Sequence, residues 1–108
     1  MVSVTQVLEA QVLGEGEWIA VTEICQLCRI DRDALMELAT LGLIEPREHS
    51  PGEWRVPAAA LPRLRVVGRL MHDLDINVNG AALVVELLEA RRELESRLRR
   101  LERLAADY

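Results

Sequence analysis

Two cysteines, Cys25 and Cys28, have the CxxC spacing that zinc sites and redox pairs use. A structural zinc site needs four ligands, and only His49 and His72 could complete one with them. Neither histidine lies at a spacing typical of a zinc site, and the sequence has no second CxxC. We therefore predict no metal or redox role, and interpret both cysteines as small core residues on the inner face of a helix.

No other group of residues has the spacing of a catalytic site. His49 and His72 could each act as a general base, but no serine, cysteine or carboxylate is fixed beside either by its spacing. The segment Gly14-Glu15-Gly16 lacks the lysine and the helix that a phosphate-binding loop needs. Asp73 and Asp75 are interpreted as part of a polar loop. We therefore predict that the protein is not an enzyme and binds no cofactor, and an enzyme or metal sensor built on the two cysteines is the weakest functional hypothesis.

Length and composition favour one small domain with an aliphatic core. The chain has 108 residues, of which 50% are hydrophobic and only 3% aromatic. Its net charge is −5 and every basic residue is arginine, a balance that disfavours binding to a polyanion. Because the chain has only two cysteines, no signal peptide and no apolar stretch long enough to cross a bilayer, we expect it in the cytoplasm without membrane association.

The elements that must position these residues begin near the N-terminus. Residues 4–13 are rich in valine and leucine and predict a strand, alone or in a hairpin with Trp18-Ile19. Apolar residues then recur at helical spacing over Val21–Cys28, which predicts a short helix. Asp31 is a suitable N-cap for a second helix, and Gly42 stands where that helix needs a C-cap. Two short helices joined by a tight turn form a helix-turn-helix unit.

A wing and a third helix are predicted to follow. The extended runs Leu43–Arg47 and Glu53–Val56 flank the turn-forming sequence Ser-Pro-Gly, which is typical of a β-hairpin. Helical spacing returns from Ala58 to about Leu74, with Pro62 in the first turn, where proline is tolerated. Asn77 is a suitable N-cap for the last helix.

The last helix, predicted over about 78–105, repeats its apolar positions every seven residues. At 1.5 Å per residue it would be about 40 Å long, too long for a small head to cover. We therefore predict a coiled coil with a second copy of the chain, either parallel or antiparallel. The residues expected to form this dimer contact are Leu87, Arg91, Leu94, Leu98 and Leu101. On the opposite face, Glu93 with Arg97 and Glu95 with Arg99 are expected to form ion pairs.

The predicted fold class is mainly α. A winged helix-turn-helix head over residues 1–76 begins with a short strand or hairpin, and residues 77–108 form a dimerisation helix in the same structural unit. This order resembles the MerR-type winged helix-turn-helix family, and more closely the CbpM-type chaperone modulators. The resemblance covers about Val21 to Leu104 and rests on TEICQLCRI, ALMELATLGLIEPRE, GEWRV and HDLDINVNGAALVVELLE. The chain departs from DNA-binding relatives at Ala20, where they commonly have a capping threonine or serine.

The resemblance implies a protein partner. Proteins of this kind bind the J-domain of the DnaJ-like co-chaperone CbpA and inhibit its work with the Hsp70 DnaK, without chemistry of their own. J-domains of this class carry a basic second helix, whereas residues 17–56 here contain eight acidic residues and four arginines, a net charge of −4. The opposite signs favour encounter and discrimination more than raw affinity. The expected partner-binding residues are Asp33, Glu37, Glu45, Glu48, Glu53 and Arg55.

The alternative function is a DNA-binding transcriptional regulator of MerR type. It would use Arg32, Arg47 and Arg55 against phosphates and base edges. Carboxylates such as Asp33 and Glu37 in the groove would forfeit the gain from counterion release, so we expect DNA binding to be unfavourable.

Overall fold

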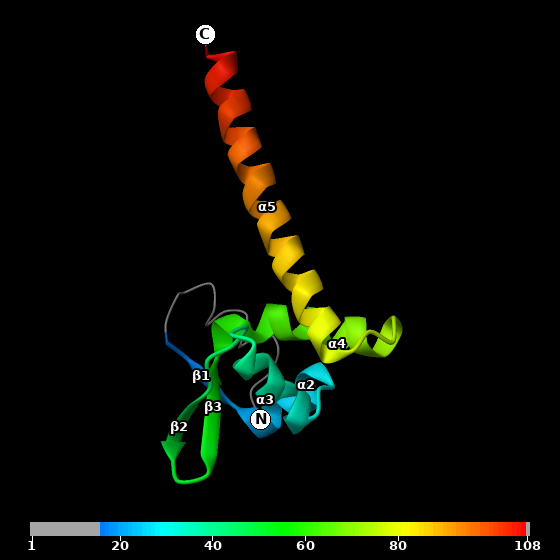
Figure 1. Cartoon of the computed structure of the whole chain (residues 1–108). Helices are drawn as coiled ribbons and strands as arrows, with labels where there is room; N and C mark the ends of the chain where they lie inside the picture. Colours follow the sequence, from blue (N-terminus) through cyan, green and yellow to red (C-terminus); the bar gives the residue numbers. More distant parts are fainter. Residues whose placement is uncertain (1–15, 108) are drawn as a thin grey trace.

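The computed structural model describes residues 16–107. It is mainly helical, with a small three-stranded sheet and a long C-terminal helix that projects from the rest of the molecule (Figure 1). The strand predicted over residues 4–13, and its hairpin with Trp18-Ile19, lie outside the described residues. Trp18-Ile19 itself does form a strand, β1 (Trp18–Ala20), which pairs antiparallel with β3 (Glu53–Pro57).

Two short helices follow β1, as the apolar spacing predicted. The first is α2 (Val21–Cys28), whose N-cap, Ala20, offers no side-chain hydrogen bond to the helix. The second is α3 (Arg32–Thr40), where the Asp31 carboxylate accepts a hydrogen bond of 2.7 Å from the backbone N–H of Ala34. The Asp31 cap satisfies a donor that the helix cannot satisfy itself. The predicted N-cap is thus confirmed.

The hairpin begins later than the sequence pattern suggested. Its strands are β2 (Arg47–Ser50) and β3, and the sheet order is β1-β3-β2. The prediction that an extended strand starts at Leu43 is wrong, because Leu43 and Ile44 are both buried and each is only 4% exposed. A half-buried strand alternates its side chains between core and solvent, so two consecutive core residues instead mark a loop segment that anchors to the core.

The third predicted helix is found with a modified start. A single 3-10 turn (Ala58–Ala60) leads into α4 (Leu61–Asp73), with Pro62 in the first turn, as expected. The last helix, α5 (Val78–Ala106), begins at Asn77, whose side-chain oxygen accepts a hydrogen bond of 2.8 Å from Gly80 N–H. This second predicted N-cap is also confirmed.

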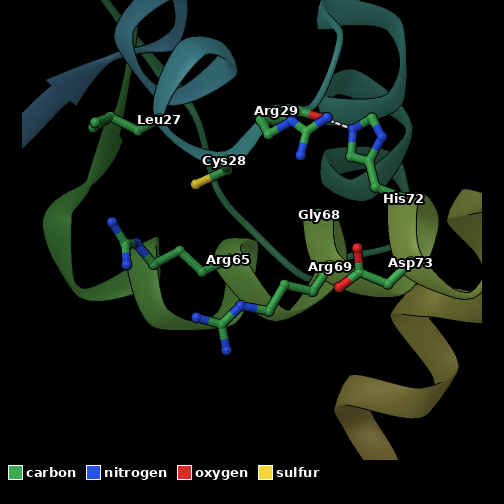
Figure 2. A pocket seen from close by; sticks show the side chains of 8 residues that line it. All are labelled: Leu27, Cys28, Arg29, Arg65, Gly68, Arg69, His72 and Asp73. Carbon is green, nitrogen blue, oxygen red and sulfur yellow. Dashed lines mark hydrogen bonds between the residues drawn. The ribbon is translucent and has the colours of Figure 1, made fainter.

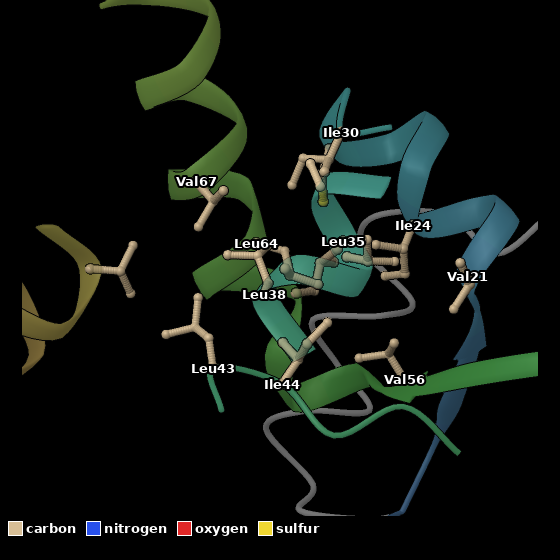
Figure 3. Close-up of a cluster of buried hydrophobic side chains, with 14 of the residues drawn as sticks. Val21, Ile24, Ile30, Leu35, Leu38, Leu43, Ile44, Val56, Leu64 and Val67 are labelled. Atoms are coloured by element: carbon tan, nitrogen blue, oxygen red, sulfur yellow. The ribbon is translucent and has the colours of Figure 1, made fainter. Parts of the chain in front are cut away.

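The core is a single aliphatic cluster between these elements. Figure 3 shows side chains of α2, α3, α4 and β3 converging, among them Ile24, Leu35, Leu38 and Leu64, each fully buried. No buried polar or charged residue interrupts the cluster within residues 16–107. The low aromatic content therefore produces the leucine, valine and isoleucine core that the composition indicated.

Only the base of α5 belongs to this core. Ala81, Ala82 and Val85 are buried against it, and the rest of the helix extends away (Figure 1). The 29 residues of α5 correspond to about 43 Å at 1.5 Å per residue. The longest dimension of the described chain, 58 Å, follows from this projection.

Candidate functional site

The two cysteines lie side by side on α2 but differ in exposure. Cys28 is buried, and Cys25 is half-buried at the edge of the core. Burial raises the pKa of the Cys28 thiol to about 11, and also raises the pKa of Cys25. Within residues 16–107, no three His, Cys, Asp or Glu side chains gather closely enough to hold a metal ion. Both thiols therefore have the surroundings of side chains that pack in or beside the core.

Alkylation at neutral pH should be slow at Cys28. A pKa of about 11 leaves only a small thiolate fraction at neutral pH, and the thiolate is the form that reacts. Its reactivity should increase as the pH rises toward 11, where the thiol ionises. Mass spectrometry after iodoacetamide treatment would compare Cys28 with the more accessible Cys25, and unfolding in urea should equalise the two rates. A native Cys28 that reacts as fast as a free cysteine would contradict this assignment.

The acidic residues of α3 form the first part of the predicted partner surface. Asp33 and Glu37 are exposed and lie one turn apart, while Ala34, Leu35 and Leu38 on the other side of the helix are buried. Within the described chain, neither carboxylate has an ion-pair partner. They are therefore available to an incoming group of opposite charge.

The acidic residues of the β2–β3 hairpin are engaged within the hairpin. The Glu53 carboxylate accepts hydrogen bonds from two nitrogens of Arg55, Nε at 3.0 Å and Nη2. It also accepts one from Ser50 Oγ at 3.0 Å. These interactions with Arg55 and Ser50 lower the pKa of Glu53. Glu48 accepts the Gly52 backbone N–H at 3.2 Å across the turn. Both carboxylates thus help to hold the hairpin, and the Arg55 charge is balanced by Glu53.

The predicted acidic residues fall into two groups. The helix α3 packs on α2 and α5, whereas the hairpin packs on β1 and α2. Glu45 is exposed on the segment that joins α3 to β2. Trp54 is 36% exposed and stands opposite Glu48 in the strand register.

The three arginines of the DNA-binding alternative have different surroundings. Arg55 is paired with Glu53, and the Arg47 guanidinium lies over the Trp18 ring, 5.9 Å from its centroid. The same ring is approached edge-on by His49, with 4.9 Å between centroids. Arg32 is exposed at the start of α3. Arg32 is therefore the one of the three that has no ion pair or aromatic contact within residues 16–107.

A cluster of basic residues that the sequence analysis did not single out lies between α2 and α4. Figure 2 shows Arg65 and Arg69 on α4 and Arg29 at the end of α2, around a hollow of about 260 Å³. His72 also lines this hollow, and its Nε2 donates a hydrogen bond to the Arg29 carbonyl. The indication of this cluster in the sequence is limited to the four-residue spacing of Arg65 and Arg69, which places them on one face of a helix.

The predicted dimer contact lies on the free part of α5. Leu87, Leu94, Leu98 and Leu101 are between 56% and 63% exposed. The exposed apolar face is wider than predicted and also includes Leu83 and Leu104.

Charged residues of α5 pair along the helix. Arg91 is 76% exposed and forms an ion pair of 2.8 Å with Glu95, so Glu95 does not pair with Arg99 as expected. The expected pair of Glu93 and Arg97 is confirmed at 3.1 Å. An arginine can turn its charge outward while its stem stays beside an apolar face. Over residues 16–107, no helix has the length and apolar character needed to span a bilayer.

Arg63 connects the base of α5 to the head. Its guanidinium donates to the Leu43 carbonyl at 2.7 Å and to the Glu89 carboxylate at 2.8 Å. Through this one side chain of α4, the segment that follows α3 is joined to α5. The acidic face of α3 and the projecting helix are therefore held in a defined relation.

Comparison with known proteins gives a consistent result. Residues 19–103 match the family described as MerR HTH family regulatory protein. The chain is 31% identical over 98 residues to the chaperone modulatory protein CbpM of Coxiella burnetii, covering 91% of this chain and 92% of that protein. It is 32% identical over 73 residues to CbpM of Pseudomonas entomophila, with 68% and 72% covered, and 32% identical over 84 residues to CbpM of Salmonella paratyphi B, with 78% and 79% covered. No solved structure matches the chain.

Proposed function

Because this chain belongs to the MerR HTH family of regulatory proteins and is a CbpM-type chaperone modulator, we propose that it binds the J-domain of a DnaJ-like co-chaperone. In this proposal it is a non-catalytic cytoplasmic protein, and its partner is a co-chaperone of the CbpA type. Binding masks the J-domain and thereby inhibits the action of the co-chaperone on Hsp70. We interpret α2, α3 and the β2–β3 hairpin as a winged helix-turn-helix head that binds a protein in place of DNA.

The observation that carries this proposal is the acidic outer face of α3. In a helix-turn-helix protein that reads DNA, the second helix enters the major groove and must approach phosphates. Here the second helix presents Asp33 and Glu37 to solvent, with no ion-pair partner in the described chain. A basic polypeptide surface complements these charges, whereas a phosphate backbone is repelled by them. The basic second helix of the J-domain is such a surface.

The hairpin contributes less charge to this surface than its sequence suggests. Glu53 and Arg55 neutralise one another, and the Glu48 carboxylate keeps its charge but accepts a hydrogen bond from the Gly52 N–H of the turn. We therefore place the electrostatic centre of the J-domain site on Asp33 and Glu37, with Glu45 on the segment that follows α3. Glu48, Glu53 and Arg55 remain at its edge, where Trp54 supplies exposed apolar area of the kind that binding hot spots use.

DNA binding by the same head is disfavoured by the surroundings of its arginines. The charge of Arg55 is matched by Glu53, and Arg47 is held over Trp18. A DNA-binding head gains affinity from each phosphate it neutralises, and of these three arginines only Arg32 has no ion pair or aromatic contact in the described chain. The names of the curated relatives also point to chaperone modulation.

The proposed protein is a homodimer joined through α5. The exposed leucines repeat at intervals of three, four or seven residues along one side of a helix that the head does not cover. Such a side is buried most simply by the same side of a second copy, because a twofold contact is self-complementary. A dimer would present two acidic α3 faces, one on each head.

The ATPase activity of Hsp70 tests the proposal. The J-domain co-chaperone is expected to stimulate ATP hydrolysis, and the full chain should return the stimulated rate toward the basal rate as its concentration rises. The basal rate without co-chaperone should not change, because the proposed target is the J-domain. A stimulated rate that stays constant in a saturating excess of the chain would refute the proposal.

A further inference from the structure

The hollow between α2 and α4 has a charge opposite to that of the molecule. Three arginines, Arg29, Arg65 and Arg69, line it with His72, and Asp73 is the one acidic residue of its lining. With His72 neutral, the lining carries a net charge of +2, from three guanidiniums and one carboxylate, in a chain whose net charge is −5. Within residues 16–107, none of the three guanidiniums has a carboxylate partner. The hollow therefore concentrates positive potential that the protein itself does not balance.

One donor in this lining is left unsatisfied. The Nε atom of Arg65 is buried and has no hydrogen-bond partner within the described chain. An unpaired buried donor is unfavourable, and charged donors more so than neutral ones, so native structures nearly always provide an acceptor. An anionic ligand in the hollow would supply that acceptor once the Arg65 side chain turns its covered Nε toward it. The Cys28 thiol beside Arg65 cannot do so as a thiolate, because burial raises its pKa to about 11.

The walls of the hollow are fixed by two close contacts between α2 and α4. A Cβ atom on Gly68 would lie 2.0 Å from the Cys28 carbonyl oxygen, so α4 can approach α2 this closely only with glycine there. At the other end, His72 Nε2 donates a hydrogen bond to the Arg29 carbonyl. Arg29 takes a left-handed conformation, with φ of 57°, at the end of α2. The guanidiniums therefore project from a rigid frame, which lowers the entropy lost on binding.

The geometry points to an oxyanion site in this hollow, whose ligand is a small phosphomonoester. Arginine forks match the tetrahedral oxygens of phosphate, and several of them around one point suit a charge near −2. A volume of about 260 Å³ is slightly below the usual range for drug-sized ligands, and therefore accommodates a phosphate group with a short organic portion. Because the arginines line a hollow between two helices, the arrangement favours one compact group over an extended nucleic-acid backbone.

The site is independent of the proposed J-domain interaction. The hollow is formed by α2 and α4, whereas Asp33 and Glu37 lie on α3. A test of phosphate binding needs no co-chaperone, so a failure to bind phosphate would leave the proposed function standing. A failure to inhibit the co-chaperone would likewise leave the phosphate site standing.

Calorimetric titration of the full chain tests the site. Inorganic phosphate and glycerol phosphate serve as probes, with sodium chloride at matched ionic strength as the blank. Both probes should give saturable heats, and Arg65→Gln should weaken their binding by about tenfold or more, because a charge-assisted hydrogen bond is lost. The control variant Arg100→Gln removes one exposed arginine of α5, outside the hollow, and should bind as the original protein does. Circular dichroism would show that both variants remain folded.

Two results would overturn the inference. The first is the absence of any heat from phosphate beyond that of the chloride blank. The second is an unchanged affinity for phosphate in Arg65→Gln, which would place the binding elsewhere on the chain. A short DNA duplex forms the third arm of the experiment, and displacement of phosphate by the duplex in an Arg65-dependent manner would replace the small-ligand assignment with a nucleic-acid contact.

Discussion

Substitution of Asp33 and Glu37 with lysine is expected to weaken binding to the J-domain by about 10- to 100-fold, since like charges brought together at an interface cost several kcal/mol and about 1.4 kcal/mol is a factor of ten. Both residues are exposed on the outer face of α3. The change should leave the fold intact because neither side chain contributes to the core. Calorimetry at low salt would measure the affinity.

The control for this variant is a charge change of the same size elsewhere. Glu86 and Glu102 are exposed on α5, and Glu86→Lys with Glu102→Lys alters the net charge by the same amount. This control should retain most of the affinity if position on the surface matters more than net charge. Added salt should weaken the original complex and have less effect on the Asp33→Lys, Glu37→Lys variant. Equal losses in the two variants would mean that only the overall charge acts, and the assignment to α3 would fail.

Introduction of glutamate at Leu94 and Leu101 is expected to abolish dimerisation, with a loss of affinity between copies of about 100-fold or more. Each leucine buried at a contact is worth about 2 kcal/mol, and an unpaired carboxylate in the same place adds a further penalty. Both leucines are 63% exposed in the single chain, so the folded head should not be affected. Sedimentation equilibrium should show the mass falling from twice the chain mass to the chain mass of 12.2 kDa.

Arg99→Glu provides the matched control for the tail. It changes the net charge by the same two units, and it stands two residues before Leu101, about 160° around the helix from it. This variant should remain dimeric because that face is not part of the leucine stripe. A dimer that survives both leucine substitutions would show that the copies associate through another surface. An unsubstituted protein that sediments at the mass of one chain would show that there is no dimer to disrupt.

Local signals in the sequence predicted much of the head. The N-caps at Asp31 and Asn77 could be predicted because each acts on a backbone N–H three residues further on, at Ala34 and Gly80. The helix over Val21–Cys28 follows from apolar spacing alone. In these cases the interactions that decide the structure lie within a few residues of each other.

The start of the hairpin could not be predicted in the same way. Leu43 and Ile44 have the composition of a strand, but both side chains are buried in the core that α3 and α4 help to form. Their conformation is set by tertiary packing, which overrides local preference. The strand therefore begins at Arg47, the first residue of an exposed run.

The candidate site was predicted in its charge but not in its arrangement. Sequence counts all carboxylates equally, whereas Glu53 is held by Arg55 and Glu48 by the Gly52 N–H. The basic hollow depends on contact between Cys28 and Gly68, forty residues apart, which no local pattern reveals. Side-chain partners and long-range contacts must therefore be seen in the structure.

We propose that α3 is the surface that binds the J-domain, and nuclear magnetic resonance titration of the labelled chain with an unlabelled J-domain tests this proposal. The largest amide shifts should fall on α3, around Asp33 and Glu37, with smaller ones on the β2–β3 hairpin. Shifts confined to the far end of α5 or to the hollow beside Arg65, with α3 unchanged, would contradict it.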